Sequence, residues 1–211
     1  MGATYPAIRI LGQTVPPLLG MGARFLLAGL LLFGVLALRD RRRLAGHWDQ
    51  RWRAAGLGVW ILGDIGLIAW AEQHVEAGLA ALVIASVPLW VILLRTSTGS
   101  RPVRPELLAV TVGVAGLVVL LRPGTGSVAL GWVLLLVPAA VIEATGVVTS
   151  QHLAQPPDPF TATAWQLTGA GTALLAAGAA LGELERCTTS AFTADTAIAF
   201  AFLVLPGSLL A

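Results

Sequence analysis

Four ionisable side chains lie inside long apolar stretches of this sequence, where a charge is costly. Asp64 and Glu143 are acidic, and Arg9 and Arg24 are basic. An ionised residue at the centre of a bilayer costs about 2.5–3.5 kcal/mol on insertion scales, so such residues usually face the interior of a helix bundle. These four could bind a zwitterionic small molecule or take part in proton coupling. The alternative is a structural role, as polar contacts between helices.

The remaining reactive residue types do not form the pattern of a metal site or a disulfide framework. His47, His74 and His152 lie in loops or at helix ends without the spacing of metal ligands. Cys187 is the one cysteine. Glycine pairs inside the apolar stretches favour close helix packing over phosphate binding. The sequence therefore predicts no metal, no cofactor and no catalytic residues.

The apolar stretches that carry the four charges predict an all-α membrane protein. Of 211 residues, 56% are hydrophobic and 11% are charged, and the mean hydropathy is +0.83. Soluble domains carry about 25% charged residues. Because backbone groups in lipid must be satisfied within a segment, each stretch is expected to be a helix. The expected spans are residues 20–38, 54–71, 77–94, 107–121, 128–149, 162–181 and 196–211.

The arginines predict how these helices are oriented, since the sequence has no lysine. Nine of the 13 arginines lie in residues 39–53 and 95–104, which are expected on the cytoplasmic side. The loops expected outside hold two, Arg122 and Arg186. No basic face suggests nucleic-acid binding. The expected surroundings are membrane lipid, in the inner membrane of a bacterium.

Both ends of the sequence have the character of interrupted helices. Residues 1–11 are too short to cross a bilayer, and residues 200–211 end without a basic or polar flank. We expect truncation at both ends, with a short interfacial or re-entrant end as the alternative.

Two segments share a spacing that suggests an internal repeat. Each has a proline, a polar residue seven positions later and a glycine five further on: Pro17, Arg24 and Gly29 in one, Pro159, Gln166 and Gly171 in the other. The segments open the second and the seventh expected helices. An offset of five helices reverses the direction of insertion, which is the inverted-repeat architecture of many secondary transporters. The predicted division is 1–122 and 128–211, the second part incomplete.

Five stretches, in their order and spacing, resemble EamA-type members of the drug/metabolite transporter superfamily. These are residues 2–10, 24–30, 77–88, 113–121 and 202–211. The sequence departs from that pattern at 95–101, where many members carry a Gly-Glu pair. The resemblance implies ten helices in two five-helix repeats, of which this chain would hold most of helix 1, all of helices 2 to 7 and part of helix 8.

The resemblance also implies a function and a site. The function is secondary transport of small metabolites, such as amino acids or related compounds, by alternating access and without enzyme activity. Tyr5 and Trp70 are expected at a cavity between the repeats, with Gln73 and Gln166 as further polar contacts. The expected partners are a small-molecule substrate and a coupling proton. A membrane-embedded enzyme acting on a lipid-linked substrate and a non-transporting structural subunit are the alternatives.

Overall fold

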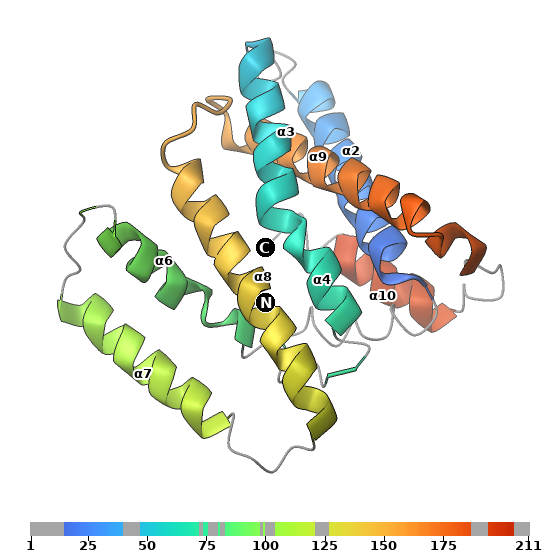
Figure 1. Cartoon of the computed structure of the whole chain (residues 1–211). Helices are drawn as coiled ribbons and strands as arrows, with labels where there is room; N and C mark the ends of the chain where they lie inside the picture. The colour runs from blue at the N-terminus through green and yellow to red at the C-terminus, as the bar shows by residue number, and fades with distance from the viewer. Residues whose placement is uncertain are drawn as a thin grey trace.

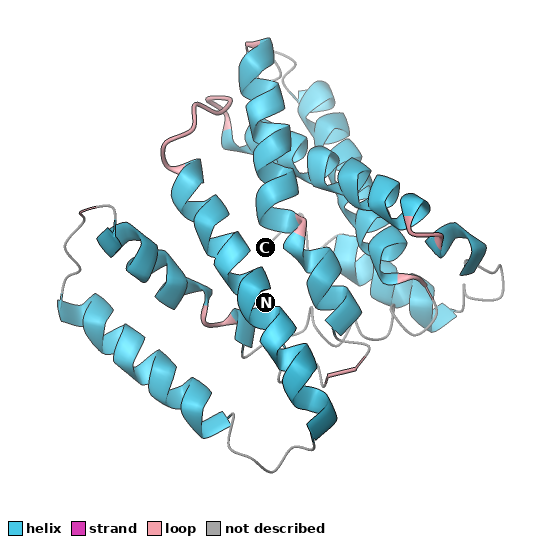
Figure 2. Ribbon diagram, viewed as in Figure 1, coloured by secondary structure: helices cyan, strands magenta, loops and turns pink. Residues whose placement is uncertain are grey.

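Helices make up the regular structure of the described part of the chain, with no strand among those residues (Figure 2). The computed structural model describes residues 15–39, 47–71, 74–75, 80, 83–97, 99, 104–120, 127–186 and 194–204. The elements are α2 (Pro17–Arg39), α3 (Trp48–Leu62), α4 (Asp64–Ala71), α6 (Val87–Ser97), α7 (Arg104–Leu120), α8 (Ser127–Ser150), α9 (Pro159–Ala180), the 3-10 turn η2 (Glu183–Arg186) and α10 (Ala194–Val204). The all-α prediction is confirmed.

Two apolar stretches among the described residues are long enough to cross a bilayer. They are Pro17–Arg39 and Trp48–Ala71. The C-terminal end of α2 and the N-terminal end of α3 meet at the top of Figure 1, beside the connection from α8 to α9. The two helix ends, Arg39 of α2 and Trp48 of α3, therefore lie at one end of the bundle.

The helix expected over residues 54–71 lies within the apolar span Trp48–Ala71, and a one-residue turn at Gly63 divides that span into α3 and α4. The amide of Gly63 donates to the carbonyl of Val59 at 3.0 Å, and the amide of Gly66 donates back to Gly63 at 3.2 Å. A Cβ at Gly63 would collide with the Val59 carbonyl oxygen, so this turn requires glycine. The second helical piece, α4, begins at Asp64.

The helix expected over residues 77–94 is also interrupted. Val83 and Ile84 are helical, residues 85–86 form a turn, and α6 begins at Val87. Pro88 therefore lies in the first turn of a helix, where its missing N–H removes no intrahelical hydrogen bond. The apolar run hid this boundary because the turn is formed by alanine and serine, which do not interrupt the run.

The closest helix pair is α2 and α9, which run antiparallel with their backbones in contact. A Cβ added at Gly22 would lie 3.1 Å from the carbonyl oxygen of Gly171. A Cβ at Gly29 would lie 3.0 Å from the amide of Thr168 and 3.1 Å from the carbonyl oxygen of Ala164. Small residues at such an interface allow the approach on which helix packing in membranes depends.

The contacts between α2 and α9 come in reciprocal pairs. The shift of 142 positions that carries Pro17 onto Pro159 carries Gly22 onto Ala164, Leu26 onto Thr168 and Gly29 onto Gly171. The contact of Gly22 with Gly171 has its equivalent, under this shift, in the contact of Gly29 with Ala164. The contact of Leu26 with Gly171 has its equivalent in the contact of Thr168 with Gly29. A two-fold axis between the helices produces this reciprocity. The shared spacing in the sequence thus corresponds to a packing relation in the fold, while the division at 122 and 128 stays a prediction.

Helix α9 is packed with equal closeness on its other side, against α3. A Cβ at Gly58 of α3 would fall on the backbone of Gln166, and a Cβ at Gly169 would fall on the backbone of Ala55. Helix α9 therefore lies between α2 and α3, as Figure 1 shows, with glycines at both contacts.

The other half of the bundle is built on α8, which packs against α3, α4 and α6, while α7 packs on α6 (Figure 1). Helix α4 joins the two halves. Its Ala69 belongs to an apolar cluster with Met21, Phe25 and Leu174. Its Ile68 and Ala71 belong to a second cluster with Leu136 and Ala139 of α8.

Candidate functional site

The strongest candidate for a functional residue is Asp64, the first residue of α4. Its side chain is 2% exposed. Its carboxylate oxygens have no hydrogen-bond partner of good geometry in the described part of the chain. The amides of Asp64 and Ile65, at the positive end of α4, give it weak electrostatic support. A buried polar group without partners is destabilising, so its presence calls for an explanation in function.

Glu143 of α8 is the acidic neighbour of Asp64. It is half-buried and acts electrostatically on the Asp64 carboxyl group. Two neighbouring carboxylates of like charge repel in low-dielectric surroundings, and a cation or a shared proton relieves that repulsion. The sequence predicts both residues at membrane depth, and the fold packs their helices, α4 and α8, against each other.

The contact between α3 and α8 fixes the position of Glu143. One turn further along α8, Gly146 lies against Ile61, where an added Cβ would be 2.5 Å from that side chain. The indole N–H of Trp60 donates to the hydroxyl of Thr145 at 3.1 Å. Sequence reasoning missed this pair, because a tryptophan in an apolar span is more often an interfacial anchor and the threonine lies 85 residues away.

Arg24 is buried, and the contacts described for it lie toward α10 and along its own helix. Its Nε donates to the carbonyl of Leu203 at 3.2 Å, and its guanidinium lies 5.0 Å from the centre of the Phe25 ring. One of its terminal nitrogens is 3.8 Å from the sulfur of Met21. These contacts tie α2 to the C-terminal end of α10. The expected balance of Arg24 with the two acids is not among the contacts described.

The other predicted residues divide into two groups. Gln166 donates to the side-chain oxygen of Gln155 at 2.7 Å, at the cytoplasmic end by our orientation. Trp70 is 49% exposed and lines a cavity near the start of α2. The remaining three lie outside the described residues: Tyr5, Arg9 and Gln73. Among the described residues, no group of three metal-ligating side chains could hold a metal ion.

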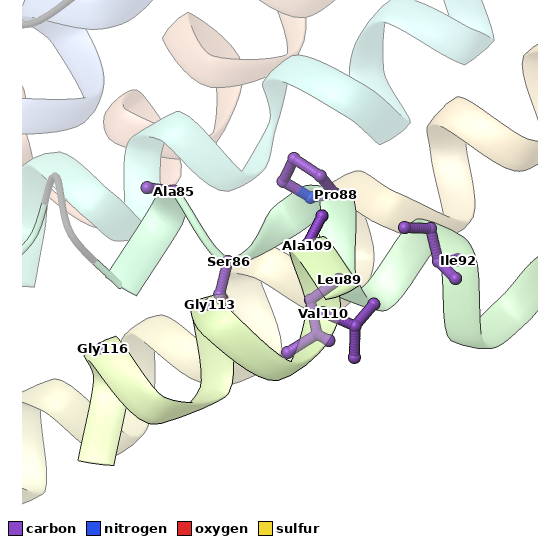
Figure 3. A pocket seen from close by; sticks show the side chains of 9 residues that line it. All are labelled: Ala85, Ser86, Pro88, Leu89, Ile92, Ala109, Val110, Gly113 and Gly116. Carbon is purple, nitrogen blue, oxygen red and sulfur yellow. The ribbon is translucent and has the colours of Figure 1, made fainter. Parts of the chain in front are cut away.

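A cavity of about 250 Å³ lies between α6 and α7, and Figure 3 shows its walls. Apolar side chains and the glycines Gly113 and Gly116 form most of the lining, and Ser86 is the one polar side chain in it. Ser86 is already engaged, since it accepts a hydrogen bond from the indole of Trp90 at 3.2 Å. Ligand sites need convergent polar groups to fix a solute, so this cavity does not compete with the Asp64 region.

Helices that pack through small residues, with acids buried at a helix break, are typical of a multi-pass membrane protein. Residues 1–122 match the model of the EamA-like transporter family. Over all 211 residues the chain is 32% identical to the "Uncharacterized inner membrane transporter YedA" of Escherichia coli (strain K12), and it covers 67% of that protein. It is 28% identical over 92 residues to Protein PagO of Salmonella typhimurium (strain LT2), which is 44% of this chain and 30% of PagO. No solved structure matches the chain.

The chain belongs to the EamA-like transporter family, and so to a family of multi-pass membrane transporters. The resemblance found in the sequence is confirmed. Membership of this family favours transport over the two alternatives, a lipid-modifying enzyme and a structural subunit.

Proposed function

We propose that this protein is a secondary transporter of small metabolites, amino acids or related compounds, in a bacterial inner membrane. The observation that carries the proposal is the buried Asp64 at the turn between α3 and α4, with Glu143 of α8 close enough to act on it electrostatically. Discontinuous helices with buried polar groups mark substrate and ion sites in many transporters. The family and the printed name of YedA, an inner membrane transporter, agree with this reading.

The two acids would act on the positive part of a ligand. The ammonium group of a zwitterionic substrate, or a coupling proton shared between the carboxyl groups, would relieve their repulsion. The attraction of the two acids for an ammonium group or a proton is stronger here than it would be in water, because the surroundings are apolar. Exchange of one occupant for the other would couple substrate movement to proton movement.

The contact of α2 with α9 would serve as the axis of alternating access. It joins the predicted first repeat, 1–122, to the predicted second repeat, 128–211. Its backbones are already in contact, so the two helices cannot move closer. Rotation about their two-fold axis would leave this contact intact while opening the α4–α8 contact to one side and then the other.

Counterflow of radiolabelled amino acids in proteoliposomes tests the proposal with the full-length protein. Asp64→Asn and Glu143→Gln should each lower the exchange rate at least tenfold, since each removes one charge and keeps the shape of the side chain. Asp49→Asn is the matched control, because Asp49 is exposed and pairs with Arg53 at 3.4 Å on the first turns of α3. Unchanged exchange in both acidic variants would remove the pair from the transport site.

A further inference from the structure

A second cavity lies at the end of the bundle where α2 begins and α4 ends. Its volume is about 310 Å³, at the low end of the range of small-molecule sites. The lining consists of Leu18, Gly66, Leu67, Trp70, Leu181 and Glu183. Gly66 lies two residues beyond Asp64, about 3 Å along the helix axis, and Trp70 lies about 9 Å beyond it. Neither Asp64 nor Glu143 is among the residues that line this cavity.

Glu183 is the one charged side chain in the lining of this cavity, and it is 9% exposed. One carboxylate oxygen accepts the amide of Leu19 at 3.0 Å, and the other accepts the amide of Leu18 at 3.5 Å. Both amides belong to the first turn of α2, where N–H groups have no intrahelical partner. An ionised carboxylate has about four acceptor positions, so Glu183 keeps capacity for a donor that enters from the cavity.

The start of α9 shows what capping alone requires. The amide of Thr161 donates to a carboxylate oxygen of Asp158 at 2.9 Å. The shift of 142 positions carries Leu19 onto Thr161. The amides at these two equivalent positions therefore both donate to a carboxylate. In α9 the acid is the adjacent N-cap residue, whereas in α2 it comes from 164 residues further along the chain. Of these two acids, Glu183 also lines a cavity described in this structure.

We propose that this cavity binds a small organic cation, with its ammonium group against Glu183 and its apolar body against Trp70 and the leucines. The carboxylate repels anions, and the apolar walls favour a hydrophobic body over a fully hydrated ion. The indole of Trp70 adds an aromatic face, which attracts cations as well as apolar groups. Gly66 lets α4 pack closely against α2 and α9 at the wall of the cavity, since a Cβ there would lie 2.6 Å from Leu18 and 2.8 Å from Leu174. This binding goes beyond the proposed transport function, and it can be measured without transport.

Isothermal titration of the purified full-length protein tests the inference with three probes of similar size. These are 2-phenylethylamine as the cation, 2-phenylethanol as the neutral analogue and 3-phenylpropionate as the anion. The cation should bind with saturation, the alcohol at least tenfold more weakly and the anion not measurably. Failure of the wild-type protein to bind the cation, or equal binding of cation and anion, would overturn the inference.

Variants locate the cation. Glu183→Gln keeps an acceptor for the Leu19 amide and should weaken cation binding at least tenfold. Asp158→Asn removes the equivalent charge from α9 and should leave binding unchanged. Leu181 lines the cavity and is 71% exposed, so Leu181→Lys places a positive charge there. This charge should abolish cation binding, and the variant leaves the hydrogen bond from the Leu19 amide to Glu183 in place. This variant serves as the test even if Glu183→Gln does not fold.

Asp64→Asn separates this cavity from the proposed transport site. Cation binding that is lost in Asp64→Asn and retained in both Glu183→Gln and Leu181→Lys would place the cation at the central acids and overturn the inference. Binding lost in the Glu183 and Leu181 variants alone supports the outer cavity, whatever the outcome of the transport assay.

Discussion

The contact between α2 and α9 and the contact between α4 and α8 differ in what they bury. The first is made of glycines, small residues and backbone, and the reciprocal positions of its two helices touch. The second contains a helix break and two neighbouring acids, one of them without a well-formed hydrogen bond among the described residues. The two neighbouring acids thus lie at the second contact, whereas the buried Arg24 of α2 is directed toward α10. This difference indicates that the α2–α9 contact stabilises the fold and that the α4–α8 contact binds a ligand.

The largest effect should come from adding a single methyl group where the backbones of α3 and α9 are in contact. Gly58→Ala places a Cβ on the backbone of Gln166, and the helices must separate to accept it. Overpacking costs about 1–3 kcal/mol where side chains can adjust, and a backbone collision should exceed 3 kcal/mol. Thermal unfolding of the detergent-solubilised protein measures this loss.

Gly56→Ala is the control for that variant, two residues earlier on the same helix. A Cβ at Gly56 meets nothing within 4 Å. Because alanine restricts the unfolded chain and favours the helix, Gly56→Ala should stabilise by about 0.5–1 kcal/mol. Equal melting temperatures for the two variants would contradict the close contact of α3 with α9.

A smaller effect should follow from making the two repeat-related helices alike. Arg24→Gln gives α2 the residue that α9 carries at the matching position. The variant loses the buried charged hydrogen bond to the Leu203 carbonyl and the contact with the Phe25 ring. Hydrogen bonds to charged groups contribute about 1.5–3 kcal/mol, so we expect a loss of about 2 kcal/mol in the free energy of unfolding.

Protection of the amides of α10 from hydrogen exchange gives the local readout for Arg24→Gln. Protection should fall in α10 before it falls in α9. A uniform loss across the bundle, or none at all, would count against Arg24 as the tie between α2 and α10.

The smallest effect should lie at the edge of the α4–α8 region, in the bond from Trp60 to Thr145. Trp60→Phe and Thr145→Val each remove one partner of a hydrogen bond that is not deeply buried. Each should cost about 1 kcal/mol. A double-mutant cycle measures the coupling, which should be about 0.5–1.5 kcal/mol. A coupling energy of zero would show that the bond does not hold α3 to α8.

The apolar stretches predicted where the helices are, and they did not show where the chain turns inside an apolar run. The turns at Gly63 and at 85–86 consist of glycine, alanine and serine, which do not interrupt the apolar run. The proline-polar-glycine spacing predicted a relation between α2 and α9, and its two glycines, Gly29 and Gly171, lie in their contact. The contacts of Arg24 with Leu203 and Phe25 left no trace in the sequence, since spacing does not say which face of the bundle an arginine points to.

Contacts between distant residues left the weakest trace in the sequence. Asp158 is recognisable as the N-cap of α9, since it precedes a proline at the first position of a helix. Glu183 has no such local signal, because the helix that it caps lies 164 residues earlier. The pairing of Trp60 with Thr145 is hidden for the same reason.

One measurement tests most directly the claim that the buried charge of Asp64 serves a ligand and not the fold: the melting temperature and the counterflow rate of Asp64→Asn in the same preparation. The variant removes a buried charge that lacks good hydrogen bonds, so its melting temperature should equal or exceed that of the wild-type protein. Its counterflow rate should fall at least tenfold. A lower melting temperature with an unchanged rate in the folded fraction would contradict the account, since Asp64 would then hold the structure rather than the substrate.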